Sequence, residues 1–392
     1  MHLLQKLWQS TFGLAGTKIE IKSFSAFDGL RGYMAWWVVI GHALHFCGFK
    51  HPWTEFLELG NYAVGVFICL SGFVITHLLL EKKESYLPYL IRRGFRIFPI
   101  YWFALICAIL LTYAYNFTYQ GPWVHENQMR LARHIATEEN FFTHLALHIP
   151  LLHGLVPDNI FAFSSSSILA PGWSLSLEWQ FYLIAPLIVA GLARSGFSRY
   201  LILFLLAGAF VAFKKQSFVE WQYPSVLPLA LHFFLVGILS RLYLPVLARY
   251  CYIILPLGFL IVVLAPETLK TVFAVWGVFL FSVCVEFRSA KQLGLKYSKL
   301  SSFLTNLTSN AIIRSLGTLS YSTYLIHIPL FSLVGWITAM FAGEWTQKLS
   351  IISVIISCIL LVPISALLYK WIEVPFIRLG SNVVKKRSKS LS

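Results

Sequence analysis

The sequence predicts an all-α integral membrane protein, a bundle of about ten transmembrane helices with both chain ends in the cytosol. Its 392 residues are 58% hydrophobic and only 12% charged, whereas a soluble domain carries about 25% charged residues. The mean hydropathy is +0.71. The apolar residues form continuous runs, which is typical of spanning helices and not of alternating barrel strands. This composition excludes a disordered chain, a nucleic-acid-binding protein and a disulfide-stabilised scaffold.

Each predicted span is an apolar run close to the roughly 20 residues that cross a bilayer as a helix. The runs lie at residues 28–46, 61–80, 97–115, 176–193, 200–213, 223–240, 250–264, 271–287, 317–338 and 349–370. The fifth and seventh runs are short, so their boundaries are the least well defined.

The distribution of Lys and Arg sets the orientation of the bundle. With the N-terminus inside, 23 of the 31 basic residues fall in cytosolic segments and 7 fall outside, an excess that favours cytosolic ends. We therefore expect a cytosolic segment at 1–24, a transmembrane domain at 25–376 with a long external segment at 116–172, and a basic cytosolic tail at 377–392. The same distribution explains the net charge of +15 without a nucleic-acid partner.

No metal site is predicted. His144 and His148 have the i,i+4 spacing of metal ligands on a helix, but no third ligand is evident nearby. An amphipathic external helix is therefore the preferred interpretation. The six cysteines include no C-x-x-C pair, and most lie inside apolar runs, so they predict small core residues and no disulfide framework.

The first span carries the most ionisable residues. A charge at the bilayer centre costs at least ~2.5 kcal/mol, so such residues are functional candidates. Arg31 and His42 are eleven positions apart, which separates them by about 20° around the helix and about 16 Å in depth. Asp28 shares their face. An alternative stays open, in which Asp28 and Arg31 form an interfacial pair and His42 is a structural core residue.

Two arginines open the third span. Arg93 and Arg96 are three residues apart and share a helix face. Two guanidiniums placed in this way can bind phosphate oxygens in a bidentate manner. The alternative is that they are ordinary positive-inside anchors.

Polar side chains also enter three further spans. Glu178 lies near the outer start of the fourth span, where it could deprotonate or orient a partner or simply complement the helix dipole. His327 lies inside the ninth span and could be catalytic or a hydrogen-bonded core residue. Ser71 lies between Gly65 and Gly72, a pattern that suits close helix packing.

Together these segments resemble the membrane acyltransferase 3 family, over about residues 24–376. The resemblance rests on residues 27–32 with His42, 65–73, 93–99, 173–178 with 181–183, 320–322 with His327, and 373–375. Each segment is weak alone, whereas six in one order over ten spans are specific.

The resemblance implies an acyltransferase that moves acyl groups, most often acetyl, from acyl-CoA to a sugar hydroxyl of a cell-surface or exported glycan. It implies that His42 is the catalytic base and that Arg93 and Arg96 bind acyl-CoA; Arg31 and Glu178 match further motif positions. It further implies a bacterial inner (plasma) membrane location, acyl-CoA as a co-substrate with no permanently bound cofactor, and a glycan or glycolipid acceptor as partner.

The predicted topology adds a vertical arrangement to these roles. The arginines lie at the cytosolic end, while His42 and Glu178 lie toward the outer end. The depth difference of about 16 Å between Arg31 and His42 is comparable to an extended pantetheine arm. Coenzyme A bound from the cytosol could then present its thioester to an external acceptor. Supporting roles are expected for residues near this path, namely Asp28, Ser71, Tyr182, Tyr324 and His327, with Tyr182 and His327 as candidate oxyanion donors.

Two other classes of protein stay open. A polytopic transporter or flippase would also place ionisable residues along a path through the bundle. A haem protein with His42 and His327 as ligands would absorb visible light. Direct acyl transfer and transfer through a covalent intermediate are both compatible with the sequence. The oligomeric state also stays open.

Overall fold

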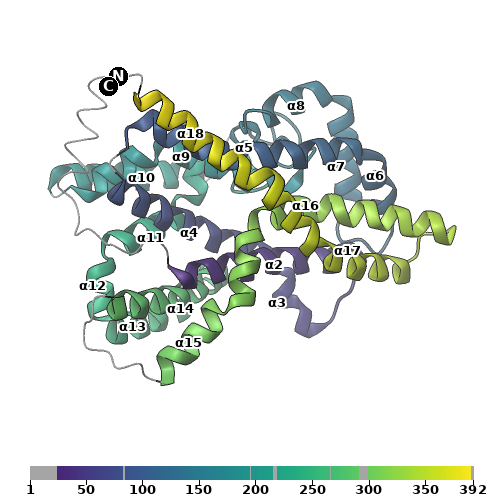
Figure 1. Ribbon diagram of the computed structural model, residues 1–392. Coiled ribbons are helices and arrows are strands. Elements are labelled where there is room, and N and C mark those ends of the chain that lie inside the picture. Colours follow the sequence, from purple (N-terminus) through teal and green to yellow (C-terminus); the bar gives the residue numbers. More distant parts are fainter. Residues whose placement is uncertain are drawn as a thin grey trace.

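The computed structural model describes residues 24–389 except 83, 195, 215–218, 265 and 291–298, and this part of the chain is helical without a β-strand (Figure 1). The central helices of the bundle are α2 (Ser25–Cys47), α4 (Gly60–Glu81), α5 (Tyr86–Leu110), α9 (Trp173–Ala193), α11 (Leu227–Leu242), α14 (Glu267–Ala290), α16 (Ala311–Ala342) and α17 (Gln347–Leu368). The remaining α-helices are α3 (Glu55–Glu58), α6 (Thr112–Tyr119), α7 (Asn127–Glu139), α8 (Phe141–His148), α10 (Phe197–Lys214), α12 (Leu244–Arg249), α13 (Cys251–Val263), α15 (Lys299–Ser309) and α18 (Val374–Lys389). Three short 3₁₀ helices, Pro52–Thr54, His153–Leu155 and Ala170–Gly172, and one π-helical turn, Tyr369–Glu373, join them.

Helix α2 lies near the centre of the molecule and packs most extensively against α16 and α4 (Figure 1). Small residues permit this close approach. A Cβ on Gly317 of α16 would lie 1.7 Å from the carbonyl oxygen of Asp28. At the contact of α2 with α15, a Cβ on Gly29 would lie 1.7 Å from the carbonyl oxygen of Thr308. Only glycine fits at these two positions.

The N-terminus of α2 is bound to α14. The backbone amides of Ser25 and Ala26 donate to the carboxylate of Glu286, at 3.1 and 3.0 Å. The first amides of a helix have no partner within the helix, and a carboxylate satisfies them and complements the helix dipole. This contact fixes the N-terminal end of the helix that carries Arg31 and His42.

The predicted packing role of the glycines around Ser71 is confirmed. Helix α4 crosses α11 so closely that a Cβ on Gly72 would lie 2.4 Å from the carbonyl oxygen of Phe234. A Cβ on Gly65 would lie 3.0 Å from Val272 of α14. The small residues therefore place the face of α4 that carries Ser71.

Seven helical stretches in the described residues are long and apolar enough to cross a membrane. They are Pro52–Glu81, Tyr86–Leu110, Ala170–Ala193, Phe197–Lys214, Leu269–Arg288, Ser302–Ala342 and Gln347–Arg387. Two further apolar helices, Leu227–Leu242 and Cys251–Leu260, are shorter. The run at 28–46 forms α2, which is not among the seven; its ionisable residues lower its hydropathy. The all-helical membrane fold is confirmed, whereas the count of ten and the cytosolic ends stay predictions.

The two predicted terminal segments have different outcomes. The N-terminal segment 1–24 lies outside the described residues except for Phe24. The segment 377–392, expected as a tail, continues as helix through Lys389 in α18. This helix lies along α5, where a Cβ on Gly380 would lie 2.7 Å from the Cβ of Phe95. The basic residues there therefore belong to a packed helix.

The segment 116–172, which we predict to be external and call the external segment, contains the end of α6, then α7, α8 and a series of turns. The predicted helix with His144 and His148 is present as α8, but both histidines are buried, not presented to solvent. His148 bridges the hydroxyls of Tyr101 and Ser167 at 2.8 and 2.9 Å, and its ring stacks on that of His153 at 3.9 Å. The histidines serve as internal contacts of this segment.

Candidate active site

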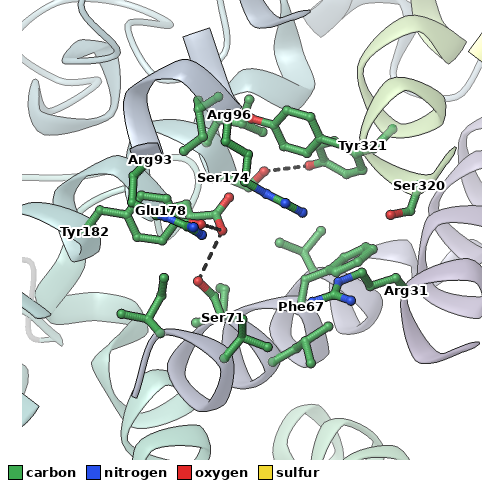
Figure 2. Close-up of a pocket in the computed structure, with 18 of the residues that line it drawn as sticks. Arg31, Phe67, Ser71, Arg93, Arg96, Ser174, Glu178, Tyr182, Ser320 and Tyr321 are labelled. Atoms are coloured by element: carbon green, nitrogen blue, oxygen red, sulfur yellow. Dashed lines mark hydrogen bonds between the residues drawn. The ribbon is translucent and has the colours of Figure 1, made fainter. Parts of the chain in front are cut away.

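A cavity of about 280 Å³ lies between α2, α4, α5, α9 and α16 (Figure 2). We call it the arginine cavity. It contains most of the residues singled out in the sequence: Arg31, Ser71, Arg93, Arg96, Glu178, Tyr182 and Tyr324. The sequence spacing of these residues, over nearly 300 positions, could not show that they share one cavity.

Three guanidinium groups face this cavity (Figure 2). Arg93 and Arg96 come from successive turns of α5, and Arg31 comes from α2. No carboxylate lies within ion-pair distance of Arg93 or Arg96 in the described part of the chain. The guanidinium of Arg93 lies 6.0 Å from the ring centre of Tyr182, and its Nε is buried without a partner among the described residues. The cavity is therefore suited to an anionic ligand.

Arg31 has one carboxylate partner. Its Nη1 lies 2.7 Å from Oδ1 of Asp28, one turn earlier on α2. The Asp28–Arg31 ion pair considered in the sequence is therefore present. Asp28 itself does not line the cavity, whereas Arg31 does, so the pair orients Arg31 while Arg31 stays available to a ligand.

Glu178 lies among the arginines. Its Oε1 accepts hydrogen bonds from the hydroxyls of Ser71 at 3.1 Å and Tyr182 at 2.5 Å. Glu178 therefore faces the arginine cavity, which His42 does not line, and its position toward the outer end stays a prediction.

His42 and His327 form a separate pair. Nδ1 of His42 lies 2.8 Å from Nε2 of His327, and the rings stack with their centres 5.0 Å apart. One ring must donate and the other accept, so the pair shares a single proton across this contact. Neither histidine lines the arginine cavity. The partner that orients His42 is His327 and not Glu178.

Tyr324 connects the two sites. It lines the arginine cavity, and its ring centre lies 6.1 Å from that of His327, one turn later on α16. Its hydroxyl is within 2.8 Å of the Ser174 hydroxyl. The histidine pair therefore adjoins the end of the cavity where Tyr324 lies.

Among the other lining residues are three with hydroxyl groups that had no individual role assigned from the sequence, namely Ser174, Ser320 and Tyr321. The hydroxyl of Tyr321 is buried and has no hydrogen-bond partner among the described residues, so it is free to donate to a ligand. A signal was present for Ser320, since Ser320, Tyr324 and His327 recur at i, i+4 and i+7 on an apolar helix. No cluster of three or more His, Cys, Asp or Glu side chains suited to a metal occurs in the described ranges.

The acyltransferase domain model of the acyltransferase 3 family matches residues 24–370. No curated protein and no solved structure matches the chain. The matched segment contains every residue that lines the arginine cavity, together with the histidine pair. The chain therefore belongs to the acyltransferase 3 family and is an integral-membrane acyltransferase.

Proposed function

We propose that this acyltransferase moves an acetyl group from cytosolic acetyl-CoA to a sugar hydroxyl of an exported glycan or glycolipid, in a bacterial plasma membrane. One observation carries the proposal: three arginines share a cavity that adjoins a hydrogen-bonded histidine pair. The arginines supply an anion site, and the histidines supply a proton acceptor. Acyl transfer from acyl-CoA to a hydroxyl uses both, since the anion site holds the donor phosphates and the base takes the hydroxyl proton.

The arginine cavity is assigned to the donor. Guanidinium groups bind phosphate oxygens through paired hydrogen bonds, and coenzyme A is rich in phosphate. The volume of about 280 Å³ is at the lower limit of pockets that bury a drug-sized ligand, ~300–1,000 Å³. It therefore suits part of the donor, namely the diphosphate and the adjoining pantetheine arm, with the adenosine outside.

His42 is assigned as the general base. If Nδ1 of His42 donates to Nε2 of His327, the other nitrogen of His42 carries a free lone pair. That nitrogen accepts the proton as the acceptor hydroxyl attacks the thioester carbonyl. The carbon–sulfur bond then breaks, and the proton passes to the departing thiolate of coenzyme A. His327 is a positioning residue in this scheme.

The tyrosines of α16 are assigned to the oxyanion that develops at the thioester carbonyl. The unpartnered hydroxyl of Tyr321 faces the arginine cavity. Preorganised hydrogen-bond donors of this kind stabilise developing charge. Tyr182 is less suited than the sequence suggested, because its hydroxyl already donates to Glu178. Glu178 is accordingly assigned to holding Ser71 and Tyr182 in place.

The family membership favours a transferase over the transporter considered in the sequence. The proposed acetyl transfer is tested with purified protein in lipid nanodiscs and acetyl-CoA that is labelled in the acetyl group. We expect acetyl-CoA hydrolysis or exchange above that of empty nanodiscs. Mass spectrometry of surface glycans should show acetyl esters that disappear when the gene is deleted. No turnover together with an unchanged glycan profile would refute the proposal.

A further inference from the structure

A second, smaller cavity of about 50 Å³ lies in the external segment. We call it the external cavity. Most of its polar lining comes from α7 and from the turns before α9, namely Arg130, Arg133, His134, Thr137, Ser166 and Ser167, and α6 adds Tyr115 and Tyr119. None of these residues lines the arginine cavity.

Arg133 is a buried cation without a counter-ion. Its exposed fraction is 8%, and no carboxylate lies within ion-pair distance of it in the described ranges. Burial and the neighbouring Arg130 both lower the pKa of Arg133. An unpaired buried charge is costly, and a bound oxyanion would offset that cost. The carboxylate nearest in sequence, Glu138, contacts His134 at 3.4 Å and is itself largely exposed.

The rest of the external cavity is held in position by internal contacts. The Nε of Arg130 donates to the carbonyl oxygen of His125 at 2.8 Å, and its guanidinium lies 5.4 Å from the ring centre of Tyr119. The hydroxyl of Ser167 is held at 2.9 Å by Nε2 of His148, whose other nitrogen contacts the hydroxyl of Tyr101. The guanidinium and hydroxyl groups are therefore oriented before a ligand arrives, which lowers the cost of binding.

The external cavity adjoins the histidine pair. Its wall includes Ile328, the residue after His327. The amide of His125 donates to the carbonyl oxygen of His45 at 2.9 Å, which attaches the external segment to the last turn of α2. Arg130 and Arg133 are close enough to interact electrostatically with His42. A group bound there lies on the external side of the proposed base.

We infer that the external cavity binds an oxyanion of the acceptor, a carboxylate or a phosphate ester, and so directs a neighbouring sugar hydroxyl toward His42. This inference rests on the proposed function, because it assigns the acceptor side of that reaction. A volume of about 50 Å³ has room for a group of few atoms and not for a sugar ring. The acceptor is therefore an acidic glycan or a phosphate-linked glycan.

The test uses three small probes on the purified full-length chain in phosphatidylcholine nanodiscs: glucuronate, glucose 6-phosphate and glucose. Binding is measured by saturation-transfer NMR with excess coenzyme A present, so that the donor arginines are occupied. We expect the two anionic probes to bind and glucose to bind far more weakly. Whichever anion binds more tightly identifies the acceptor group as carboxylate or phosphate.

Arg133→Gln should weaken binding of the anionic probes by about tenfold or more, the loss of ~1.4 kcal/mol expected for one charged contact. Arg133→Lys should keep part of the affinity, and Arg130→Gln provides a second variant at a less buried position. Lys348→Gln is the matched control, since it removes an exposed basic residue away from the external cavity and should change nothing.

Equal binding of glucose and the anionic probes, or unchanged affinity in both Gln variants, would refute the inference. The proposed function is judged separately, by acetyl-CoA turnover in the same nanodiscs. Turnover without Arg133-dependent anion binding refutes only the anion site that we infer in the external cavity. Arg133-dependent binding with no turnover and an unchanged glycan profile supports the anion site and refutes the proposed acetyl transfer.

Discussion

Two pairs of buried histidines lie in this molecule, and we assign them different roles. His42 and His327 contact each other beside the donor cavity, whereas His148 and His153 stack within the external segment. Burial lowers the pKa of His148 well below its ordinary value and that of His153 to about 3. Both external rings are therefore neutral at physiological pH and act as structural groups.

This burial predicts acid sensitivity of the fold. His153 takes up a proton in the unfolded chain near its ordinary pKa of 6.5 but only near pH 3 when folded. The unfolded state then binds more protons below pH 6.5, so the unfolding free energy falls as pH falls. One such histidine costs about 2 kcal/mol between pH 7 and pH 5.

The acid sensitivity is measured as the midpoint of thermal unfolding in detergent from pH 8 to pH 5. Replacing His153 by Phe, which keeps the stacked ring but cannot be protonated, should flatten the decline. A decline as steep in His153→Phe as in the unchanged protein would contradict this account.

At the scale of helices, the contact between α2 and α16 positions His42 against His327. Gly317→Ala would place a Cβ 1.7 Å from the Asp28 carbonyl oxygen. The helices must then separate, and this overpacking should lower the free energy of unfolding by about 1–3 kcal/mol. Acyl transfer should fall as well, because His42 and His327 move apart. Gly277→Ala on α14 is the matched control, because a Cβ there meets nothing within 4 Å.

The stability of both alanine variants is measured by unfolding in increasing concentrations of SDS. Equal stability of the two would show that the close approach of α2 and α16 is not needed for the fold.

Helix α5 allows a direct comparison of neighbouring arginines. Arg93 and Arg96 line the arginine cavity, whereas Arg92 does not and pairs with Glu84 at 2.9 Å. Arg93→Gln and Arg96→Gln should each weaken acetyl-CoA binding by roughly tenfold or more, the loss of one charge-assisted contact. Arg92→Gln removes the same charge one residue away and should not. Isothermal titration gives all three affinities, and equal loss in all three would mean general positive-inside anchoring.

The sequence predicted the helices better than it predicted their contacts. Continuous apolar runs place the spans because bilayer thickness fixes their length. The close approach of α4 to α11 and α14 was signalled by Gly65 and Gly72. The partners of Glu178 and of His42 could not be predicted, because they depend on the angles at which the helices cross. The spacing of residues along the chain does not reveal these angles. The polar contacts that bury His148 lie between distant segments and have no periodic signal.

For the whole molecule, the distribution of basic residues predicts that the external segment and α18 lie on opposite sides of the membrane. Single cysteines at Asn140 and Lys386 test this, since both positions are exposed. The six native cysteines are buried or half-buried and are replaced first. A membrane-impermeant maleimide should label position 140 in intact cells and position 386 only after lysis. Labelling of position 386 in intact cells would reverse the orientation.

The central claim is that donor binding and proton transfer belong to two adjoining sites. The most direct test measures acetyl-CoA affinity and acetyl transfer together in His42→Gln, which keeps hydrogen bonding but cannot accept a proton at neutral pH. We expect transfer to fall by about 10²–10⁴-fold, the usual contribution of a general base. Acetyl-CoA should bind with unchanged affinity, because the donor arginines do not contact His42. Near-normal transfer, or loss of donor binding together with transfer, would contradict the account.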